Sequence, residues 1–198
     1  KEFMPSLNEG SFLLMPTAMP HAGFEATKET VQKLDMAVAS IPEIETAVGK
    51  LGRAETALDP APISMFENVI IYKPEFALSD NGQRETFRVD NDNRFLLKSG
   101  DTLSNEEALQ KKISPDELIV DEDGRYFRNW REHIQSPDDI WDEIVEKTRL
   151  PGVTSAPKLQ PIETRLVMLQ TGMRAPMGIK VYGPDLETIQ DFGIELEQ

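Results

Sequence analysis

Two methionines, Met65 and Met168, offer the clearest chemistry in this sequence. Each stands among prolines and glycines that restrict the backbone, within residues 49–74 and 161–183, and outside any obvious helical stripe. A thioether is a soft, neutral ligand that suits Cu(I) and Ag(I) and binds hard cations poorly. It needs no deprotonation, so it can hold a metal over a wide range of pH. These two residues are therefore the candidate metal ligands.

Packing is the competing interpretation of both side chains. Methionine is flexible and fills irregular gaps in protein cores, and it is among the residues most often buried. Met168 is followed closely by Met173 and Met177, and such a group can be either a metal-handling surface or an apolar loop. Four other methionines are expected to be core or contact residues: Met4, Met15, Met19 and Met36.

Other chemistries find little support in the composition. The chain has no cysteine, which excludes disulfides, thiolate metal sites and cysteine nucleophiles. Its only histidines are His21 and His133, too few for a histidine-rich zinc site. No nucleophile–histidine–acid arrangement, P-loop or dinucleotide fingerprint is present, so no enzymatic activity is predicted. An enzyme that uses a carboxylate pair stays as a third hypothesis, although no residue pattern points to it.

Length and charge limit the partners of the chain. The formal net charge is −14 at pH 7, and nucleic acids and anionic lipids need a basic surface, so neither is expected to bind. No apolar run approaches the roughly 20 residues that span a bilayer, so membrane contact is expected only through segments outside this chain. The 198 residues suffice for one or two domains, and the abrupt ends suggest a piece of a larger protein.

The elements that position the candidate ligands can be read from residue patterns. Residues 10–16 indicate a buried strand, and residues 43–50 and 67–73, rich in β-branched side chains, indicate two more. Residues 24–41 repeat apolar side chains at three- and four-residue steps, which is typical of an amphipathic helix that Pro42 ends. The order of elements to this point is strand, helix, strand, strand.

A second helix is predicted over residues 137–149. Ser136 can cap its start, Pro137 suits the first helical position, and the acidic residues that follow favour the positive end of the helix. A weaker strand is predicted near 152–159. The complete order β-α-β-β-α-β, with both helices on one face of the sheet, predicts an α+β fold of the ferredoxin-like, split β-α-β kind.

Two segments fall outside this pattern. Residues 75–136 are polar and acidic, with turn signals such as Asp80-Asn81-Gly82, and predict a hairpin-rich insertion that adds little to the main core. Residues 178–198 read as a strand and a helix that begin a second, truncated subdomain. The first subdomain is therefore assigned to residues 1–74 plus 137–177.

Two longer motifs connect the candidate methionines to a known family. Residues 49–65 read GKLGRAETALDPAPISM, and residues 168–183 read MLQTGMRAPMGIKVYG. With the opening EFMPSLNEGSFLLMP, they resemble the CusA/CzcA-like heavy-metal efflux transporters of the RND superfamily, and more narrowly the copper/silver branch. The resemblance covers about residues 1–74 and 137–198. Compact members of the family connect these two parts briefly, so no family role is carried onto residues 75–136.

The resemblance implies that Met65 and Met168 are two of three thioether ligands in a periplasmic cleft, with the third ligand beyond Gln198. It implies the periplasmic portion of an inner-membrane, proton-driven Cu(I)/Ag(I) efflux pump. The parent transporter would be a trimer coupled to a periplasmic adaptor and an outer-membrane channel. Cu(I) or Ag(I) would be the transported substrate, and no cofactor is expected.

The alternative function is a non-metal protein-interaction module of a transport assembly. In that case the methionines would only pack, and the acidic insertion 75–136 would be the contact surface. This alternative would be favoured if Met65 and Met168 were both fully buried with closed packing and lay far apart.

Overall fold

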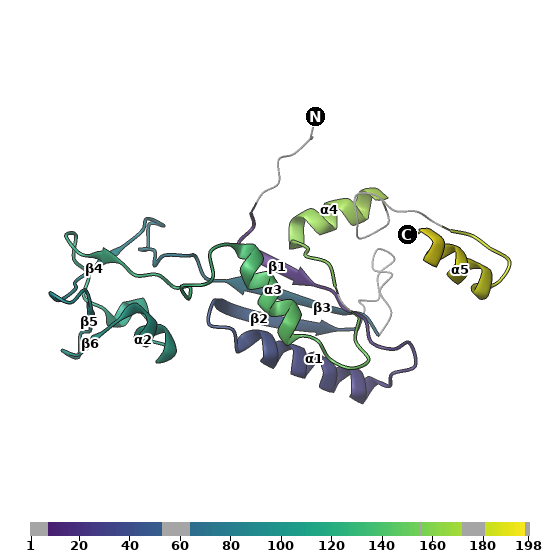
Figure 1. Ribbon diagram of the computed structural model, residues 1–198, viewed down its shortest axis with the longest axis horizontal. Coiled ribbons are helices and arrows are strands. Elements are labelled where there is room, and N and C mark those ends of the chain that lie inside the picture. The colour runs from purple at the N-terminus through teal and green to yellow at the C-terminus, as the bar shows by residue number, and fades with distance from the viewer. Residues whose placement is uncertain (1–7, 53–63, 155, 172–180, 197–198) are drawn as a thin grey trace. The chain divides into compact units, whose positions relative to one another are not determined.

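The computed structural model describes residues 8–52, 64–154, 156–171 and 181–196 (Figure 1). The chain divides into two compact units, Lys1–Pro161 and Ile162–Gln198, and each is described by itself. The first unit combines helices with small antiparallel sheets, which confirms the predicted α+β class. Among the described residues, no helix is both long enough and apolar enough to cross a membrane.

Three strands form the main sheet. They are β1 (Ser11–Leu14), β2 (Ile44–Leu51) and β3 (Phe66–Tyr72), which confirms the three stronger strand predictions. The spatial order is β1-β3-β2 and both pairings are antiparallel, so β1 and β2 run parallel on either side of β3. Alternate residues of β3 are buried, beginning with Phe66, which shows that one face of the sheet carries the core.

Helices α1 (Phe24–Ala39) and α3 (Pro137–Lys147) cover that face, as predicted (Figure 1). The α3 helix begins with a capping box in which the Ser136 side chain accepts from the Asp139 N–H and the Asp139 side chain accepts from the Ser136 N–H. One hydrophobic cluster contains side chains of both helices and of all three strands. Its members are Phe12, Leu14, Val38, Ile41, Ile44, Ile70, Tyr72, Trp130, Ile134, Ile140, Trp141 and Ile144.

Helix α1 approaches β2 closely at Gly49. A Cβ atom at this position would lie 2.6 Å from a Val31 methyl and 2.8 Å from Asp35 Oδ1, so a larger residue would clash. Asp35 accepts hydrogen bonds from the Gly49 N–H at 3.0 Å and from the Asn68 side chain at 2.6 Å. The first glycine of the 49–65 motif therefore has a structural role in joining the helix to the sheet.

The predicted strand near 152–159 is not formed, and this prediction was wrong. The segment meets the sheet only through isolated bridges, Leu13 with Leu159 and Ala18 with Val153. Pro157 lies between these contacts and has no N–H to donate to a ladder. The segment therefore follows the edge of β1 without extending the sheet.

The acidic insertion folds around a core of its own. Strands β4 (Thr86–Phe87) and β7 (Arg125–Tyr126) pair with each other, as do β5 (Phe95–Leu96) and β6 (Thr102–Leu103). The short helix α2 (Asn105–Gln110) and a 3-10 turn complete it. We call residues 77–127 the lobe, and its buried residues are Ala77, Phe87, Phe95, Leu97, Leu103, Ala108, Leu118 and Phe127.

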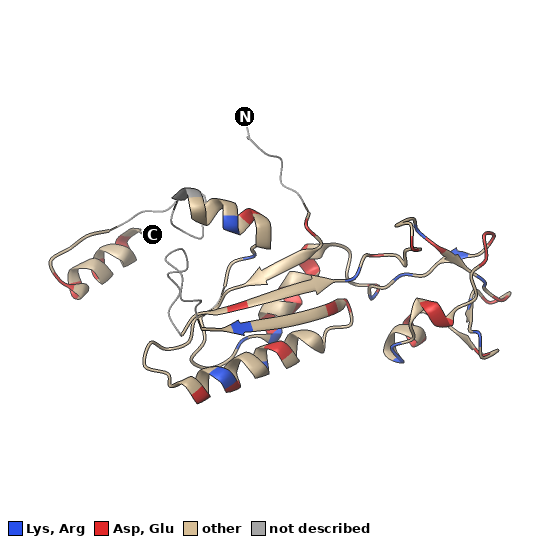
Figure 2. Cartoon of the chain, turned by 180° about the vertical axis from the view of Figure 1, so that it is seen from behind, with Lys and Arg blue, Asp and Glu red and all other residues tan. Residues whose placement is uncertain are grey.

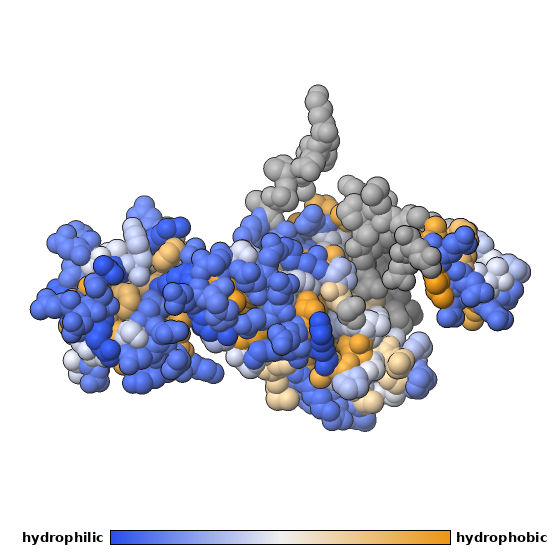
Figure 3. All heavy atoms as spheres, viewed as in Figure 1, coloured by the Kyte–Doolittle hydropathy of each residue, from blue (hydrophilic) through white to orange (hydrophobic). Residues whose placement is uncertain are grey.

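The lobe presents a polar surface around that core. The face seen in Figure 3 is mostly hydrophilic there, and Figure 2 shows acidic and basic residues interspersed along its segments. The prediction of a hairpin-bearing insertion outside the main sheet is therefore confirmed. Its expected independence from the main core was wrong at the C-terminal end, because Trp130 and Ile134 are buried in the main cluster.

The second unit contains two helices, α4 (Pro161–Thr171), which starts at the last residue of the first unit, and α5 (Leu186–Leu196). The helix predicted within residues 178–198 is confirmed by α5, and the Asp185 carboxylate before it accepts from the Thr188 N–H at 2.8 Å. The strand predicted at 178–182 falls mainly outside the described residues. The assignment of 178–198 to a second subdomain stays a prediction.

Candidate functional site

Met65 lies immediately before β3, at the point where the chain meets the segment after β1. It forms an isolated antiparallel bridge with Thr17. The bridge is enclosed by two backbone hydrogen bonds, from Phe66 N–H to the Pro16 carbonyl at 3.0 Å and from Ala18 N–H to the Ser64 carbonyl at 2.7 Å. This pattern makes Thr17 and Met65 a non-hydrogen-bonded pair, the arrangement in which facing side chains come closest. Met65 is partly exposed, so its thioether is not sealed in the core.

The opposite side of this segment is fixed as well. The Thr154 hydroxyl accepts from the Thr17 N–H at 3.0 Å and lies 2.9 Å from the Thr17 hydroxyl, while the Thr154 N–H donates to the Thr17 carbonyl at 2.9 Å. The stretch that faces Met65 is thus held between two neighbouring segments. Because the Thr17 segment pairs with Met65, the backbone at Met65 is also braced, and binding at this position would cost little conformational entropy of the backbone.

The same register places two more methionines near Met65. Met15 and Met19 lie two residues before and two residues after Thr17, and side chains two apart on an extended segment share a face. Met15 is therefore a diagonal neighbour of Met65, a relation that long side chains can bridge, and Met19 follows directly after Ala18, the last residue with a described pairing. Met15 is 2% exposed and Met19 is 53% exposed. Sequence reasoning treated both as packing or contact residues, because nothing local reveals which distant segment pairs with Thr17.

A pocket opens beside this pair of segments. Its volume is about 470 Å³, and its lining includes Thr17, Met19, Ser64, Val153 and Thr154. The two threonine hydroxyls bond to each other, so they are partly occupied as donors and acceptors. Among the described residues, no three His, Asp or Glu side chains gather where they could hold a metal ion.

Met168 lies in α4 and is partly exposed. The sequence left open whether its surroundings form a strand or a short helix, and the structure shows a helix. Met65 belongs to the first unit and Met168 to the second, so their convergence on one cleft stays a prediction. Met173 and Met177, the other members of the predicted cluster, lie outside the described residues.

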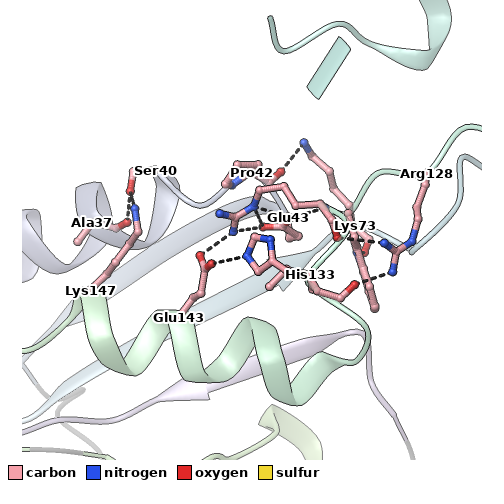
Figure 4. Close-up of polar contacts among 12 residues, drawn as sticks. Ala37, Ser40, Pro42, Glu43, Lys73, Arg128, His133, Glu143 and Lys147 are labelled. Atoms are coloured by element: carbon pink, nitrogen blue, oxygen red, sulfur yellow. Dashed lines mark hydrogen bonds and ion pairs between the residues drawn. The ribbon is translucent and has the colours of Figure 1, made fainter. Parts of the chain in front are cut away.

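The most strongly coupled ionisable groups form a separate network, drawn in Figure 4. Glu43 is fully buried, and Arg131 donates to it from Nε at 2.9 Å, from Nη2 at 2.7 Å and from its backbone N–H at 2.8 Å. Arg131 Nη2 also reaches Glu143 Oε2 at 2.6 Å, and His133 Nε2 lies 3.2 Å from Glu143 Oε1. The network joins the segment that follows the lobe to β2 and α3.

Both carboxyl groups of this network are held in the charged form. Burial, the largest single influence, raises the pKa of Glu43, but the hydrogen bonds from Arg131 together outweigh it and the pKa is lowered. The pKa of Glu143 is lowered by the same balance, with hydrogen bonds from Arg131 and His133 opposing burial. The pKa of Arg131 is raised, first by its hydrogen bond to Glu43. Neither carboxyl is thus poised to exchange protons near neutral pH, and the network fits a structural role.

Comparisons with known proteins agree on one group of transporters. No family model matches the sequence. The chain is 28% identical over 197 residues to the cation efflux system protein CusA of Escherichia coli strain K12, covering 100% of this chain and 14% of CusA. It is 30% identical over 188 residues to the cation efflux system protein SilA of Salmonella typhimurium, covering 95% of this chain and 13% of SilA.

A less similar relative is named for two metals. The nickel and cobalt resistance protein CnrA of Cupriavidus metallidurans is 24% identical over 189 residues, or 96% of this chain and 13% of CnrA. A crystal structure of a heavy metal efflux pump superposes with a TM-score of 0.62 at 19% identity, covering 98% of this chain and 15% of the pump. The chain thus spans about one seventh of the relatives that it matches.

Proposed function

The chain belongs to the heavy-metal efflux transporters of the RND superfamily, and from this premise we propose that it is part of a pump that exports Cu(I) or Ag(I). In this proposal it contributes methionine ligands to the substrate cleft, and it works in transport rather than in catalysis. The three-stranded sheet and helices α1 and α3 of the first unit belong to a porter subdomain on the periplasmic side of the inner membrane. The parent assembly is a proton-driven trimer that works with a periplasmic adaptor and an outer-membrane channel.

The choice of metal does not follow from the family alone, because relatives are named for cation efflux, for nickel and cobalt resistance and for cobalt–zinc–cadmium resistance. The donor chemistry near Met65 favours the soft monovalent cations. Thioethers bind Cu(I) and Ag(I) without deprotonation, whereas Zn²⁺, Ni²⁺ and Co²⁺ prefer imidazole, thiolate or carboxylate. The surroundings of Met65 offer thioethers, and the described residues offer no cluster of His, Asp and Glu.

The observation that carries the proposal is the pairing of Met65 with Thr17. It fixes Met65 on a braced segment, leaves its side chain partly exposed and brings Met15 to a neighbouring diagonal position. Met15 joins Met65 and Met168 in this proposal as a third thioether within the chain. Because single thioethers bind weakly, the loss of one ligand when the cleft opens would release the ion.

The interaction-module alternative keeps one supporting feature, the separately folded lobe with its polar surface. Its stated condition, full burial of both candidate methionines, does not hold, because Met65 and Met168 are both partly exposed. A contact role of the lobe is compatible with metal transport and does not replace it.

Substitution in the full-length transporter tests the proposal. Cells that depend on the pump and carry Met65→Ile or Met168→Ile should lose copper and silver tolerance, while the amount of pump in the membrane stays unchanged. Met36→Ile is the matched control, because Met36 is 66% exposed on α1 and should tolerate the change. Normal tolerance with both substitutions would return the interpretation to the interaction module.

A further inference from the structure

Met19 is an apolar side chain that the fold leaves open to solvent. It is 53% exposed and lines the pocket beside Ser64, the residue that precedes Met65. The same pocket is lined by Thr17, the bridge partner of Met65. An exposed methionine at a pocket wall buries little apolar surface, so it contributes little to the stability of the fold. Its thioether is accessible to a metal ion from solution.

The register puts Met19 within reach of Met65. The hydrogen bond from Ala18 N–H to the Ser64 carbonyl continues the pairing one residue beyond Thr17, so Met19 follows directly after a paired position. Diagonal neighbours on one face of an antiparallel pair have Cβ atoms about 7–8 Å apart or somewhat less. Methionine has three rotatable bonds beyond its Cα. This flexibility is the reason to consider the two sulfur atoms as ligands of one ion, with Met19 in the pocket lining and Met65 directly after Ser64 of that lining.

We propose that Met19 is a further thioether ligand, which takes up Cu(I) or Ag(I) at the mouth of this pocket and shares the ion with Met65. The inference rests on the proposed transport function and adds a residue to its site. The exposed position of Met19 makes it the outer ligand, and the partly buried Met65 is the inner one. Sharing by two thioethers gives a stepwise path from solvent, because the ion gains the second sulfur before it loses the first.

The test is an Ag(I) titration of the 198-residue chain with its eight methionine methyl groups labelled with ¹³C. Each methyl signal reports whether its own sulfur binds, and Met→Leu variants assign the signals. The Met19 and Met65 signals should shift together and saturate at the same Ag(I) concentration. Met19→Leu should weaken the affinity reported by the Met65 methyl by about tenfold, the low end of what loss of a supporting metal contact costs.

Met36 supplies the matched control, because it is also exposed, at 66% against 53% for Met19, but lies on α1 and does not line the pocket. Met36→Leu should leave the affinity unchanged. If Met65 saturates while Met19 is silent, or while Met19 responds only at the excess at which Met36 responds, the inference is overturned and the proposed function stands. A response of Met19 without Met65 would also overturn the shared site. If no methyl signal saturates, the proposed thioether function itself fails.

Discussion

At the scale of single residues, the sequence predicted which side chains are buried better than it predicted which side chains belong to the candidate site. Sequence patterns were sufficient to place core side chains, and Trp141 is 7% exposed and packs edge-on against Phe12 with 5.3 Å between ring centroids. They were not sufficient to assign Met15 and Met19, because a buried and an exposed methionine look alike in sequence. Met15 and Met19 became candidates for the site only because Thr17, which lies between them, pairs with Met65, and this long-range pairing is visible only in the fold.

Trp141→Ala should lower the free energy of unfolding by about 3–5 kcal/mol. The substitution removes a large aromatic side chain from the main cluster and leaves a cavity between α3 and the sheet. Chemical denaturation monitored by circular dichroism measures the effect. A loss below about 1 kcal/mol would show that the site collapses around the smaller residue or that α3 packs differently.

Glu43→Gln should destabilise the chain at neutral pH by about 3 kcal/mol, the low end for breaking a buried pair, because Arg131 remains 28% exposed. The pKa of Glu43 is lowered in the folded state, so its charge stabilises the fold above the unfolded pKa of about 4.3 and this contribution is lost as the pH falls. The difference in stability between the native chain and the variant should therefore shrink below about pH 4. A difference that stays constant from pH 7 to pH 3 would contradict this role of Glu43.

At the scale of elements, local patterns predicted the strands, helices and caps that build the first unit. The failures have physical causes. Residues 152–159 contain a proline that interrupts the ladder, and their pairing with β1 is reduced to single bridges. Trp130 and Arg131 look like part of a polar insertion, yet Trp130 Nε1 donates to the Lys73 carbonyl at 2.7 Å and Arg131 reaches Glu43. Contacts between residues so distant in sequence leave no local periodicity to detect.

Removal of the lobe should leave the first unit folded only if the deletion keeps Trp130 and Arg131, which contact Lys73 and Glu43. Phe76 and Arg128 form an antiparallel bridge, so residues 77–127 can be replaced by Asn-Gly, a pair suited to a two-residue hairpin turn. This variant should keep a cooperative thermal transition. Extending the deletion through residue 134 removes Trp130, Arg131 and Ile134, leaves Glu43 buried without its partner, and should abolish the transition.

Calorimetry or circular dichroism distinguishes the two deletions. Equal behaviour of both variants would contradict the account. If both fold, the segment after the lobe contributes nothing to the main core, and if neither folds, the lobe is not an independent addition.

At the scale of the whole molecule, recognition of the family came from long motifs rather than from composition. The acidic net charge argued against nucleic acids and anionic lipids as partners, but it did not indicate a transport role. The metal was predicted from the resemblance to the copper/silver branch and from thioether chemistry, and it stays a prediction because a relative named for nickel and cobalt resistance matches over 96% of this chain. The convergence of Met65 and Met168 on one ion stays a prediction, because the two residues belong to different units and local patterns say nothing of a contact between such distant segments.

The stoichiometry of Ag(I) binding tests the central claim, that Met65 and Met168 bind one ion together. Isothermal titration of the 198-residue chain, followed by Met65→Leu and Met168→Leu, separates one shared site from two independent ones. The account predicts one Ag(I) per chain, an affinity at least about tenfold weaker in either variant, and no heat above background with Zn²⁺. Two ions per chain, with each variant losing one and retaining the other at unchanged affinity, would contradict the shared site.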